Sequence, residues 1–144
     1  MKNFKFFPNL FLLILVTLLF SCKNDSSKSD EVIERFEDGT PMVVREYKND
    51  NNTKYLETRY YPNSQKQCEG NYEDGKKEGY WEVWYENGNS WSQGNFKNGL
   101  SEGKRVLYYE NGQVYIEGNY KQGQRVGTWV FYDTTGAVIK TIDY

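Results

Sequence analysis

Residues 70–93 read GNYEDGKKEGYWEVWYENGNSWSQ, and this unit recurs without a gap at residues 94–117 and 118–141, a period of 24. Four glycine columns run through the three copies and contain 12 of the chain's 13 glycines. The thirteenth, Gly39, falls in the last column of an earlier and more divergent copy. Because chance does not space glycines in this way, the chain is a tandem repeat, and each copy is expected to form one small structural unit.

Each copy carries a β-hairpin signal. Runs rich in aromatic and β-branched residues flank Asn-Gly pairs at residues 87–88 and 111–112. This pattern predicts a two-residue type I′ turn, in which both turn residues take a positive φ. Thr135 replaces the asparagine in the last copy, and because threonine tolerates positive φ poorly we expect a longer or different turn there. The segments 73–79 and 97–103 contain two glycines each and are expected to be solvated turns between hairpins.

A two-residue turn would also fix the register of each hairpin. On one face it predicts three facing pairs: Trp84 with Trp91, Tyr108 with Tyr115, and Tyr132 with Ile139. On the other face it predicts Val83 with Ser92, Leu107 with Ile116, and Phe131 with Lys140. Trp81 would fall opposite Gly94, where an indole ring can cover the bare backbone of a glycine. A further aromatic column comprises Tyr72, Phe96, Tyr120 and Tyr144.

The sequence therefore predicts an all-β fold after an N-terminal signal segment. It is an elongated single-layer antiparallel β-meander of about ten strands, built from hairpin repeats of about 24 residues and covering residues 32–144. At ~4.8 Å per strand, such a sheet is roughly 40 Å long. The stretch DEVIERF at residues 30–36 is interpreted as a first, irregular strand.

The first 21 residues have the features of an export signal. Lys2 and Lys5 give a positive start, and the apolar run LFLLILVTLLF at residues 10–20 is 11 residues long. This length is too short for a membrane-spanning helix, which needs about 20 residues, but it suits a secretory signal. The sequence Leu-Phe-Ser-Cys at residues 19–22 resembles a bacterial lipobox. The resemblance implies a signal peptide over residues 1–21, cleavage before Cys22, and diacylation of the Cys22 thiol.

The residues that follow Cys22 are small, polar and charged. Residues 22–31 are interpreted as the lipidated cysteine and a flexible tether that reaches at most ~30 Å. Two or more acyl chains on one cysteine give stable anchoring. Cleavage removes Lys2 and Lys5, so the mature chain has 16 basic and 20 acidic side chains, a net charge of −4. We expect a protein of the bacterial cell envelope, anchored to a membrane, with the outer membrane favoured and the domain periplasmic or surface-exposed.

The repeat resembles a known family. The pattern Gly-x-Trp-x-x-Tyr-x-x-Asn-Gly, followed by Gly-x-Tyr-x-x-Gly, is represented by GYWEVWYENG with GNFKNG, by GKRVLYYENG with GNYKQG, and by GTWVFYDTTG. These segments are similar to the MORN-repeat variant found in bacterial YwqK-type antitoxins, over about residues 36–144. Arg105 stands where the other copies have Trp81 and Trp129. The resemblance implies an open single-layer β-meander with a binding or scaffolding role, and no enzyme activity.

The amino-acid composition argues against several classes of active site and partner. The chain has no histidine, which removes histidine-based catalytic triads and most zinc sites. Its net charge of −2 lacks the basic excess of a nucleic-acid-binding protein. Cys68 is interpreted as a half-buried structural cysteine. The acidic residues Glu82, Glu86, Glu110 and Glu117 recur with the repeat, whereas a catalytic carboxylate pair should interrupt it. We therefore expect no enzyme activity, no metal and no cofactor.

The candidate binding face is aromatic and comprises Trp84, Trp91, Tyr108, Tyr115 and Tyr132. Two interpretations stay open: these rings form the core of a thin sheet, which we favour, or a stripe that grips a peptide, a glycan or a partner strand. The leading hypothesis is a membrane-anchored, non-enzymatic repeat lipoprotein that acts as a protein-interaction scaffold. The alternatives are an extracytoplasmic antitoxin or immunity protein that neutralises a toxin, and a carbohydrate-binding module that uses Trp84 and Trp91.

Overall fold

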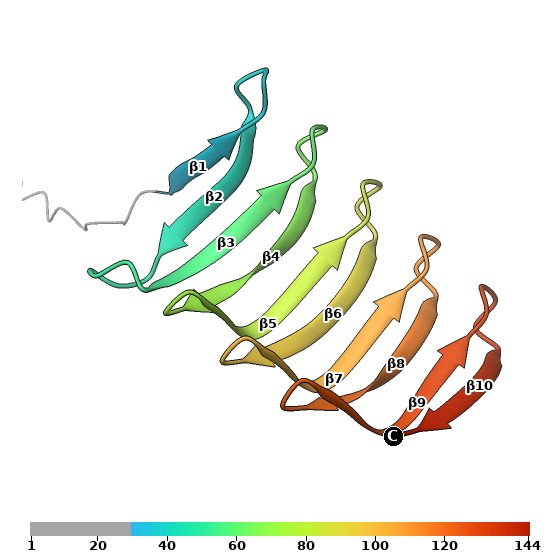
Figure 1. Cartoon of the computed structure of the whole chain (residues 1–144). Coiled ribbons are helices and arrows are strands. Elements are labelled where there is room, and N and C mark those ends of the chain that lie inside the picture. The colour runs from blue at the N-terminus through green and yellow to red at the C-terminus, as the bar shows by residue number, and fades with distance from the viewer. Residues whose placement is uncertain (1–29) are drawn as a thin grey trace, which may run out of the picture.

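The computed structural model describes residues 30–144, which form one sheet of ten strands (Figure 1). The strands are β1 Glu31–Arg35, β2 Pro41–Tyr47, β3 Lys54–Tyr60, β4 Lys66–Glu73, β5 Lys76–Trp84, β6 Ser90–Lys97, β7 Leu100–Tyr108, β8 Val114–Lys121, β9 Gln124–Tyr132 and β10 Val138–Asp143. Every strand pairs antiparallel with the next one along the chain, so the sheet order is the sequence order. The predicted all-β antiparallel meander is confirmed, including the irregular first strand, whose pairing with β2 shifts register twice. The predicted signal peptide, Cys22 and most of the tether lie outside the described residues.

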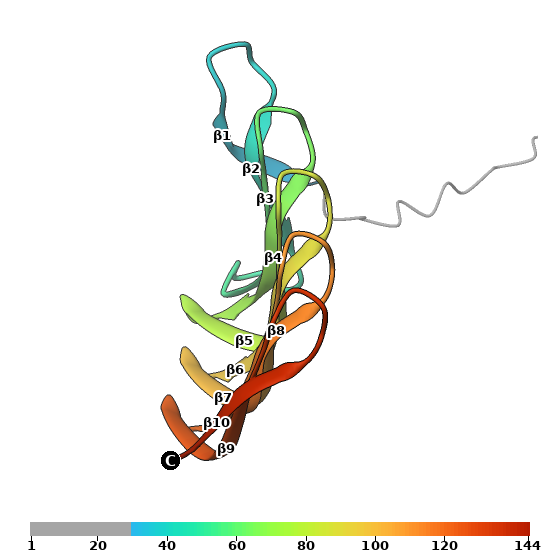
Figure 2. The same cartoon turned by 90° about the vertical axis from the view of Figure 1, so that its right-hand side faces the viewer.

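The sheet is a single layer that bends along its strands. Figure 1 shows the strands side by side as bowed ribbons, and Figure 2 shows no second layer against either face of the described sheet. Glycines at a repeating position in three long strands, Gly79, Gly103 and Gly127, take positive φ values of 68°, 72° and 63°. The register with the preceding strand shifts at each of them, which marks a β-bulge. Such bulges bend a strand, and glycine adopts their backbone without strain.

The hairpin tips that contain the Asn-Gly pairs are not type I′ turns. In the tip between β5 and β6, the Gly88 N–H donates to the Tyr85 carbonyl at 2.9 Å and the Tyr85 N–H donates to the Asn89 carbonyl at 2.8 Å. Gly88 has a φ of 87°, but Asn87 is not among the residues with positive φ. This is a three-residue loop, a type I turn followed by a left-handed glycine. The Asn87 carboxamide instead accepts a hydrogen bond from the Asn89 N–H at 2.9 Å.

The last tip, which contains Thr135, has the same loop as the tips with Asn-Gly. Gly136 N–H donates to the Asp133 carbonyl at 3.1 Å, and Asp133 N–H donates to the Ala137 carbonyl at 2.9 Å, the same pattern as in the other tips. The turn at Thr135 is therefore longer than a two-residue type I′ turn, as expected, but it does not differ from the tips that contain Asn-Gly. The physical reason is that Thr135 need not take positive φ, because only Gly136, at 89°, does so.

The two-residue turns with two positive φ values lie at the opposite end of the hairpins. They are formed by Asp74-Gly75 (φ 49° and 75°), Asn98-Gly99 (52° and 84°) and Gln122-Gly123 (50° and 81°). In each case the flanking residues pair directly, as Lys97 does with Leu100. The segments interpreted as solvated loops between hairpins are thus tight turns that join directly paired strands, consistent with type I′ geometry.

The three-residue loops change part of the predicted register. Trp84 pairs with Ser90 instead of Trp91, and equivalent shifts pair Tyr108 with Val114 and Tyr132 with Val138. The extra loop residue is absorbed by a bulge one position later. Four other predictions are therefore confirmed: Val83 with Ser92, Leu107 with Ile116, Phe131 with Lys140, and Trp81 with Gly94.

The strands present two different faces, because directly opposed residues share a face and neighbours along a strand alternate. We call the side that carries Trp81 and Trp129 the tryptophan face. The side that carries Glu69, Glu82 and Glu117 is called the glutamate face. Trp81, Trp129 and Val43 are the buried apolar side chains of the described residues, and all three lie on the tryptophan face.

The tryptophans pack on glycines of the preceding strand. A Cβ atom on Gly70 would lie 2.2 Å from Cδ2 of Trp81, and one on Gly118 would lie 2.3 Å from Cδ2 of Trp129. The predicted covering of a glycine by Trp81 is therefore real, but the glycine is Gly70 and not its other cross-strand partner Gly94. The Trp81 indole N–H also donates to the Asn71 carbonyl at 3.1 Å, and this bond orients the ring over β4.

Candidate interaction faces

The predicted aromatic stripe is divided between two places. Trp84, Tyr108 and Tyr132 lie on the glutamate face, where alternation along the strands puts them two residues from Glu82, Val106 and Val130. Trp91 and Tyr115 lie at the bulges beside the hairpin tips and are 45% and 37% exposed. The Trp91 ring lies near Tyr85, with 6.4 Å between ring centroids, and Tyr115 packs on Tyr109 at 4.8 Å. The structure therefore does not bring the five residues together as one continuous stripe.

The tyrosines of the glutamate face belong to a polar network. The Tyr108 hydroxyl donates to Oε1 of Gln93 at 2.9 Å, and Nε2 of Gln93 donates to Oε1 of Glu82 at 2.9 Å. The Tyr132 hydroxyl donates to Oε1 of Glu117 at 2.6 Å. Because hydroxyls bonded in this way have a fixed position, these two tyrosines help to hold the sheet together.

Glu117 has a second partner on the same face. The Lys104 ammonium lies 2.8 Å from Oε2 of Glu117. The hydrogen bonds from Lys104 and then Tyr132 lower the pKa of the Glu117 carboxyl. Lys66 pairs with Glu69 in a similar way at 2.6 Å. Glu69 and Glu117 are therefore compensated by lysines within the chain, whereas Glu82 bonds to the neutral side chains of Ser90 and Gln93.

Aromatic rings form much of the tryptophan face. Tyr55 stacks on Tyr72 with 5.1 Å between centroids, Tyr72 meets Trp81 edge to face at 5.1 Å, and Trp81 meets Phe96 at 6.1 Å. A second group begins with Tyr120, which meets Trp129 at 5.0 Å, and ends with Tyr144, which lies 6.2 Å from Trp129. The predicted column Tyr72, Phe96, Tyr120 and Tyr144 thus exists, but the two tryptophans connect its members.

Cations lie over these rings. Lys77 Nζ is 4.0 Å from the ring centroid of Trp81, and Cζ of Arg105 is 5.2 Å from that of Phe96. Cζ of Arg125 is 4.5 Å from the centroid of Trp129. Partial burial lowers the pKa of Lys77 and of Arg105, because desolvation disfavours their charged forms. Sequence reasoning missed this cluster. A signal was present, because Lys77 and Arg125 lie four residues before Trp81 and Trp129, an even spacing that favours the same face, and Arg105 stands at the tryptophan position itself.

The first hairpins contain a buried carboxylate on the same face. Glu57 is only 2% exposed, and its two oxygens lie 2.9 Å from Nε of Arg45 and 3.0 Å from Nε of Arg59. A buried charge needs such partners, because desolvation without them is costly. This ion-pair cluster occupies the row that holds Trp81 and Gly70 further along the sheet.

Cys68 lies on the tryptophan face opposite Val83 and is half-buried. Burial raises the pKa of its thiol, although Arg59 and Lys77 act in the opposite direction. A raised pKa leaves little thiolate at neutral pH, and the thiolate is the reactive form. The structure thus gives Cys68 the half-buried place that was predicted for it.

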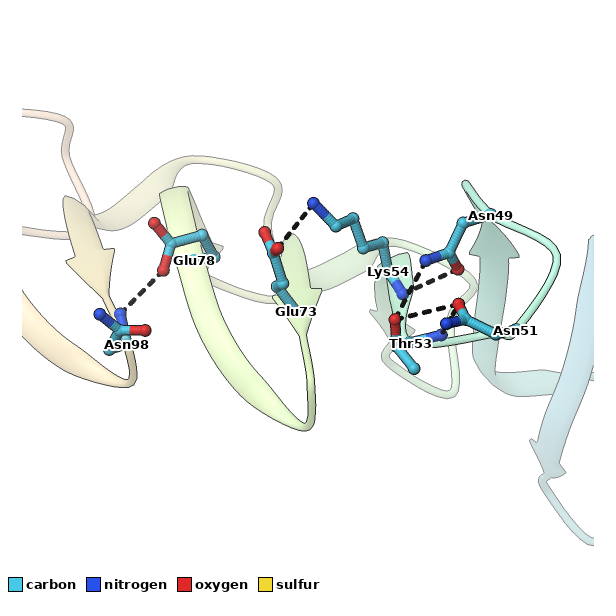
Figure 3. Close-up of polar contacts among 7 residues, drawn as sticks. All are labelled: Asn49, Asn51, Thr53, Lys54, Glu73, Glu78 and Asn98. Atoms are coloured by element: carbon cyan, nitrogen blue, oxygen red, sulfur yellow. Dashed lines mark hydrogen bonds and ion pairs between the residues drawn. The ribbon is translucent and has the colours of Figure 1, made fainter.

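A shallow cleft of about 260 Å³ lies near the tight-turn ends of the hairpins, and Lys54, Tyr55, Tyr72, Glu73 and Glu78 are among its lining residues. Figure 3 shows that its polar groups bond to one another: Lys54 Nζ lies 2.6 Å from Glu73, and Glu78 accepts from the Asn98 N–H at 2.8 Å. One repeat later Glu102 accepts from the Gln122 N–H at 2.8 Å. Glu78 and Glu102 therefore each fasten a tight turn to a strand of the hairpin before it.

Within residues 30–144, no group of three or more acidic or cysteine side chains is placed to hold a metal ion. The same residues contain no helix long and apolar enough to cross a membrane. The described chain is a tandem-repeat protein whose single sheet has two uncovered and chemically different faces.

Comparison with known families agrees with this architecture. The model of the MORN repeat variant matches the chain at residues 56–74, 77–98 and 101–122. The chain therefore contains three MORN repeats of the variant type at these residues, as its sequence pattern indicates. No curated protein and no solved structure gives a significant match.

Proposed function

We propose that this protein is a lipid-anchored, non-enzymatic scaffold of the bacterial cell envelope that binds another protein. The observation that supports binding most directly is the uncovered sheet: over residues 30–144 neither face is packed against a second layer, and large rings such as Trp91 remain exposed. Exposed apolar patches of this kind are typical of interaction sites. The lipobox-like residues before Cys22 support the anchor.

The anchor is tested by Cys22→Ser in cells grown with a labelled fatty acid. The wild-type protein is expected to carry the label and to sediment with membranes, because acylation at Cys22 anchors it. The variant is expected to lose both properties. Label incorporation by the variant would show that the lipoprotein assignment is wrong.

The scaffold function is tested by photo-crosslinking in intact cells. A photoreactive amino acid at Trp91 is expected to give a discrete adduct with one protein, while the same group at Glu86 on the exposed tip serves as the control. If neither position gives an adduct that differs from background, the scaffold proposal fails.

Trp91→Ala distinguishes the two interpretations of the aromatic residues. If Trp91 belongs mainly to the core, the variant melts at a lower temperature and loses its partner only through unfolding. If Trp91 is mainly a binding residue, the melting curve stays unchanged while the crosslinked or co-purified partner is lost.

The two alternative functions differ in their partners. An extracytoplasmic antitoxin would protect cells against one toxin, and the crosslinked partner would then be that toxin. A carbohydrate-binding module would retain a glycan, and its expected platform is Trp84 with Trp91. The ring contact of Trp91 is with Tyr85, so the structure offers no paired tryptophan platform to favour the glycan alternative.

A further inference from the structure

The tryptophan face carries a charge opposite to that of the whole chain. In strands β2–β10 its cations are Arg45, Arg59, Lys77, Arg105, Arg125 and Lys140. The carboxylate of this face in these strands is Glu57, which pairs with Arg45 and Arg59. The net charge of the chain is −2. Although the whole chain has a net negative charge, the tryptophan face is therefore basic.

Four of these cations have no anionic partner within residues 30–144. Lys77, Arg105, Arg125 and Lys140 form no ion pair there, and their charged groups lie over aromatic rings instead. Rings attract a cation through their negative faces but leave its net charge uncompensated. These groups are consequently available to carboxylates from another molecule.

Each 24-residue copy keeps at least one such cation, although its position changes. Lys77 and Arg125 occupy equivalent places in the first and third 24-residue copies, and the middle copy has Ser101 there. That middle copy instead has Arg105 at the tryptophan position, where its side chain approaches Gly94 as Trp81 approaches Gly70. Covering a glycine does not require a charge, because tryptophan does it in the other two copies. The retained feature is at least one such cation per repeat, and the third copy has Lys140 as a second one.

The spacing of the strands that carry these cations, β5, β7 and β9, matches an extended polypeptide. One repeat advances the sheet by two strands, which is about 10 Å. A polyproline II chain has three residues per turn with a rise of ~3.1 Å each, so every third residue returns to the same side after ~9 Å. Carboxylates at every third residue would therefore meet one cation per repeat.

We propose that the tryptophan face binds an extended acidic segment of the protein partner, with an Asp or Glu at every third residue lying along Lys77, Arg105 and Arg125. This inference rests on the proposed scaffold function and specifies the chemistry of its partner. Guanidinium groups suit carboxylates because their forked donors can bind both oxygens. The half-buried rings of Phe96 and Tyr120, on the strands between those that carry the cations, would contact the apolar residues of the segment.

A single bound chain fits this face better than an anionic membrane does. The sheet is one layer, so the carboxylates of the glutamate face lie on the order of 10 Å from a ligand on the tryptophan face. This distance is comparable to the Debye length of ~8 Å at physiological salt. A broad anionic surface would therefore also be repelled by the carboxylates there that have no lysine partner, such as Glu82, and by the acidic hairpin tips, whereas a narrow chain follows the row of cations.

The test uses the full-length protein in a non-ionic detergent and a fluorescent peptide of Glu-Pro-Pro triplets. Fluorescence anisotropy is expected to show binding that weakens as salt rises. A peptide of the same composition with its glutamates in one block is expected to bind at least about tenfold more weakly, because it cannot place one carboxylate per repeat. A Lys-Pro-Pro peptide is expected not to bind. Equal affinity for the triplet and block peptides, or no binding of either, overturns the proposal.

Matched variants locate the site. The triple variant Lys77→Gln, Arg105→Gln, Arg125→Gln is expected to bind the triplet peptide at least about tenfold more weakly. The control Lys76→Gln, Lys97→Gln, Lys121→Gln removes the same charge from the other face and is expected to change affinity less than about twofold. The charge-preserving triple Lys77→Arg, Arg105→Lys, Arg125→Lys is expected to bind the triplet peptide, because it keeps all three positive charges. Its binding also verifies that the face tolerates substitution at these positions.

Two further outcomes would overturn the inference. Equal losses in both Gln triples would show unspecific charge attraction. Binding to phosphatidylglycerol vesicles through the same three cations, without peptide binding, would identify an anionic membrane as the ligand instead. If the triplet peptide does not bind but the photoreactive group at Trp91 still gives its adduct, the acidic segment is rejected and the scaffold function stands.

Discussion

The first hairpins and the regular repeats fill the same row of the sheet by different means. In the repeats the row holds Trp81 over Gly70 and Trp129 over Gly118. In β2 and β3 the row holds the ion pair of Arg45 and the buried Glu57. The same position in this single-layer sheet can thus be filled either by an aromatic ring packed on a glycine or by a buried ion-pair cluster. The two solutions should fail in response to different changes.

The largest effect is expected from Gly118→Ala. Its Cβ would lie 2.3 Å from Cδ2 of Trp129, a rigid and buried ring, so the ring or the strand must move. Overpacking of this kind costs about 3 kcal/mol in the free energy of unfolding. Urea denaturation followed by tryptophan fluorescence measures this loss.

Gly94→Ala is the matched control for that substitution. Its Cβ would lie 2.7 Å from Cδ of Arg105, whose flexible chain can shift, so a loss of about 1 kcal/mol or less is expected. If the two alanine variants are equally unstable, the ring-on-glycine contact is not what distinguishes the outer repeats.

In the first hairpins, Glu57→Gln is expected to lower the free energy of unfolding by about 2 kcal/mol. Arg45 and Arg59 would lose an ionised partner. The loss of stability stays below the usual cost of breaking a fully buried ion pair, because both arginines are partly solvated. Glu46→Gln removes an exposed pair with Lys48 and should change stability by about 0.5 kcal/mol or less. Similar losses in the two variants would contradict the importance of the buried cluster.

A smaller difference is expected between valine substitutions at two equivalent tips. Gly112 and Gly39 have φ values of 84° and 86°, and a Cβ on either meets no atom within 4 Å. The local strain of valine, on the order of 1–2 kcal/mol, is therefore the same at both tips. Gly112→Val should nevertheless lower the melting temperature more, because a central repeat supports neighbours on both sides. Equal shifts in calorimetry would show that the terminal hairpin is coupled as strongly as the central one.

The smallest expected effect depends on pH. The Asp133 carboxylate accepts hydrogen bonds from the Thr135 hydroxyl at 2.6 Å and from the Thr135 and Ala137 N–H groups at 2.8 and 3.0 Å. The bonds from Thr135, then that from Ala137, lower the pKa of Asp133 below its ordinary 3.8. A lowered folded-state pKa means that the stabilisation is present above the ordinary pKa and is lost as pH falls through the folded-state value.

Asp133→Asn should therefore melt slightly below the wild type at neutral pH. The difference should shrink as the pH is lowered through the carboxyl range, because the wild-type aspartate then becomes protonated too. Thermal melts at stepped pH values measure this convergence. A constant difference across the acidic range would show that the ionised form of Asp133 contributes nothing to the tip.

Local signals sufficed for the repeat and most of the register, but not for the turn types. Asn87 and Asn98 both precede a glycine in the sequence, yet only Asn98 takes positive φ. The difference is set by how many residues separate the paired strands, and the dipeptide does not encode that number. Where the bulge after a tip absorbs the extra residue, the predicted pairs, such as Val83 with Ser92, remain correct.

The candidate faces were only partly visible in the sequence. The aromatic residues were found, but Trp84 and Trp91 were assigned to one facing pair, and the bulge separates them. The basic face was missed because net charge averages both sides of a sheet. Alternation already puts Lys77 and Arg105 on the side of the tryptophans, but their lack of anionic partners depends on which side chains the sheet brings near them.

The sequence by itself determined the period, the antiparallel meander and the division of residues between two faces, because each follows from local turn signals and the two-residue repeat of a strand. The tertiary structure decided which glycine each tryptophan covers, where the bulges bend the strands, and which charges are paired within the chain. These depend on contacts between neighbouring strands, where one extra residue in a loop or one rotamer of Trp81 selects among arrangements that the linear pattern leaves equivalent.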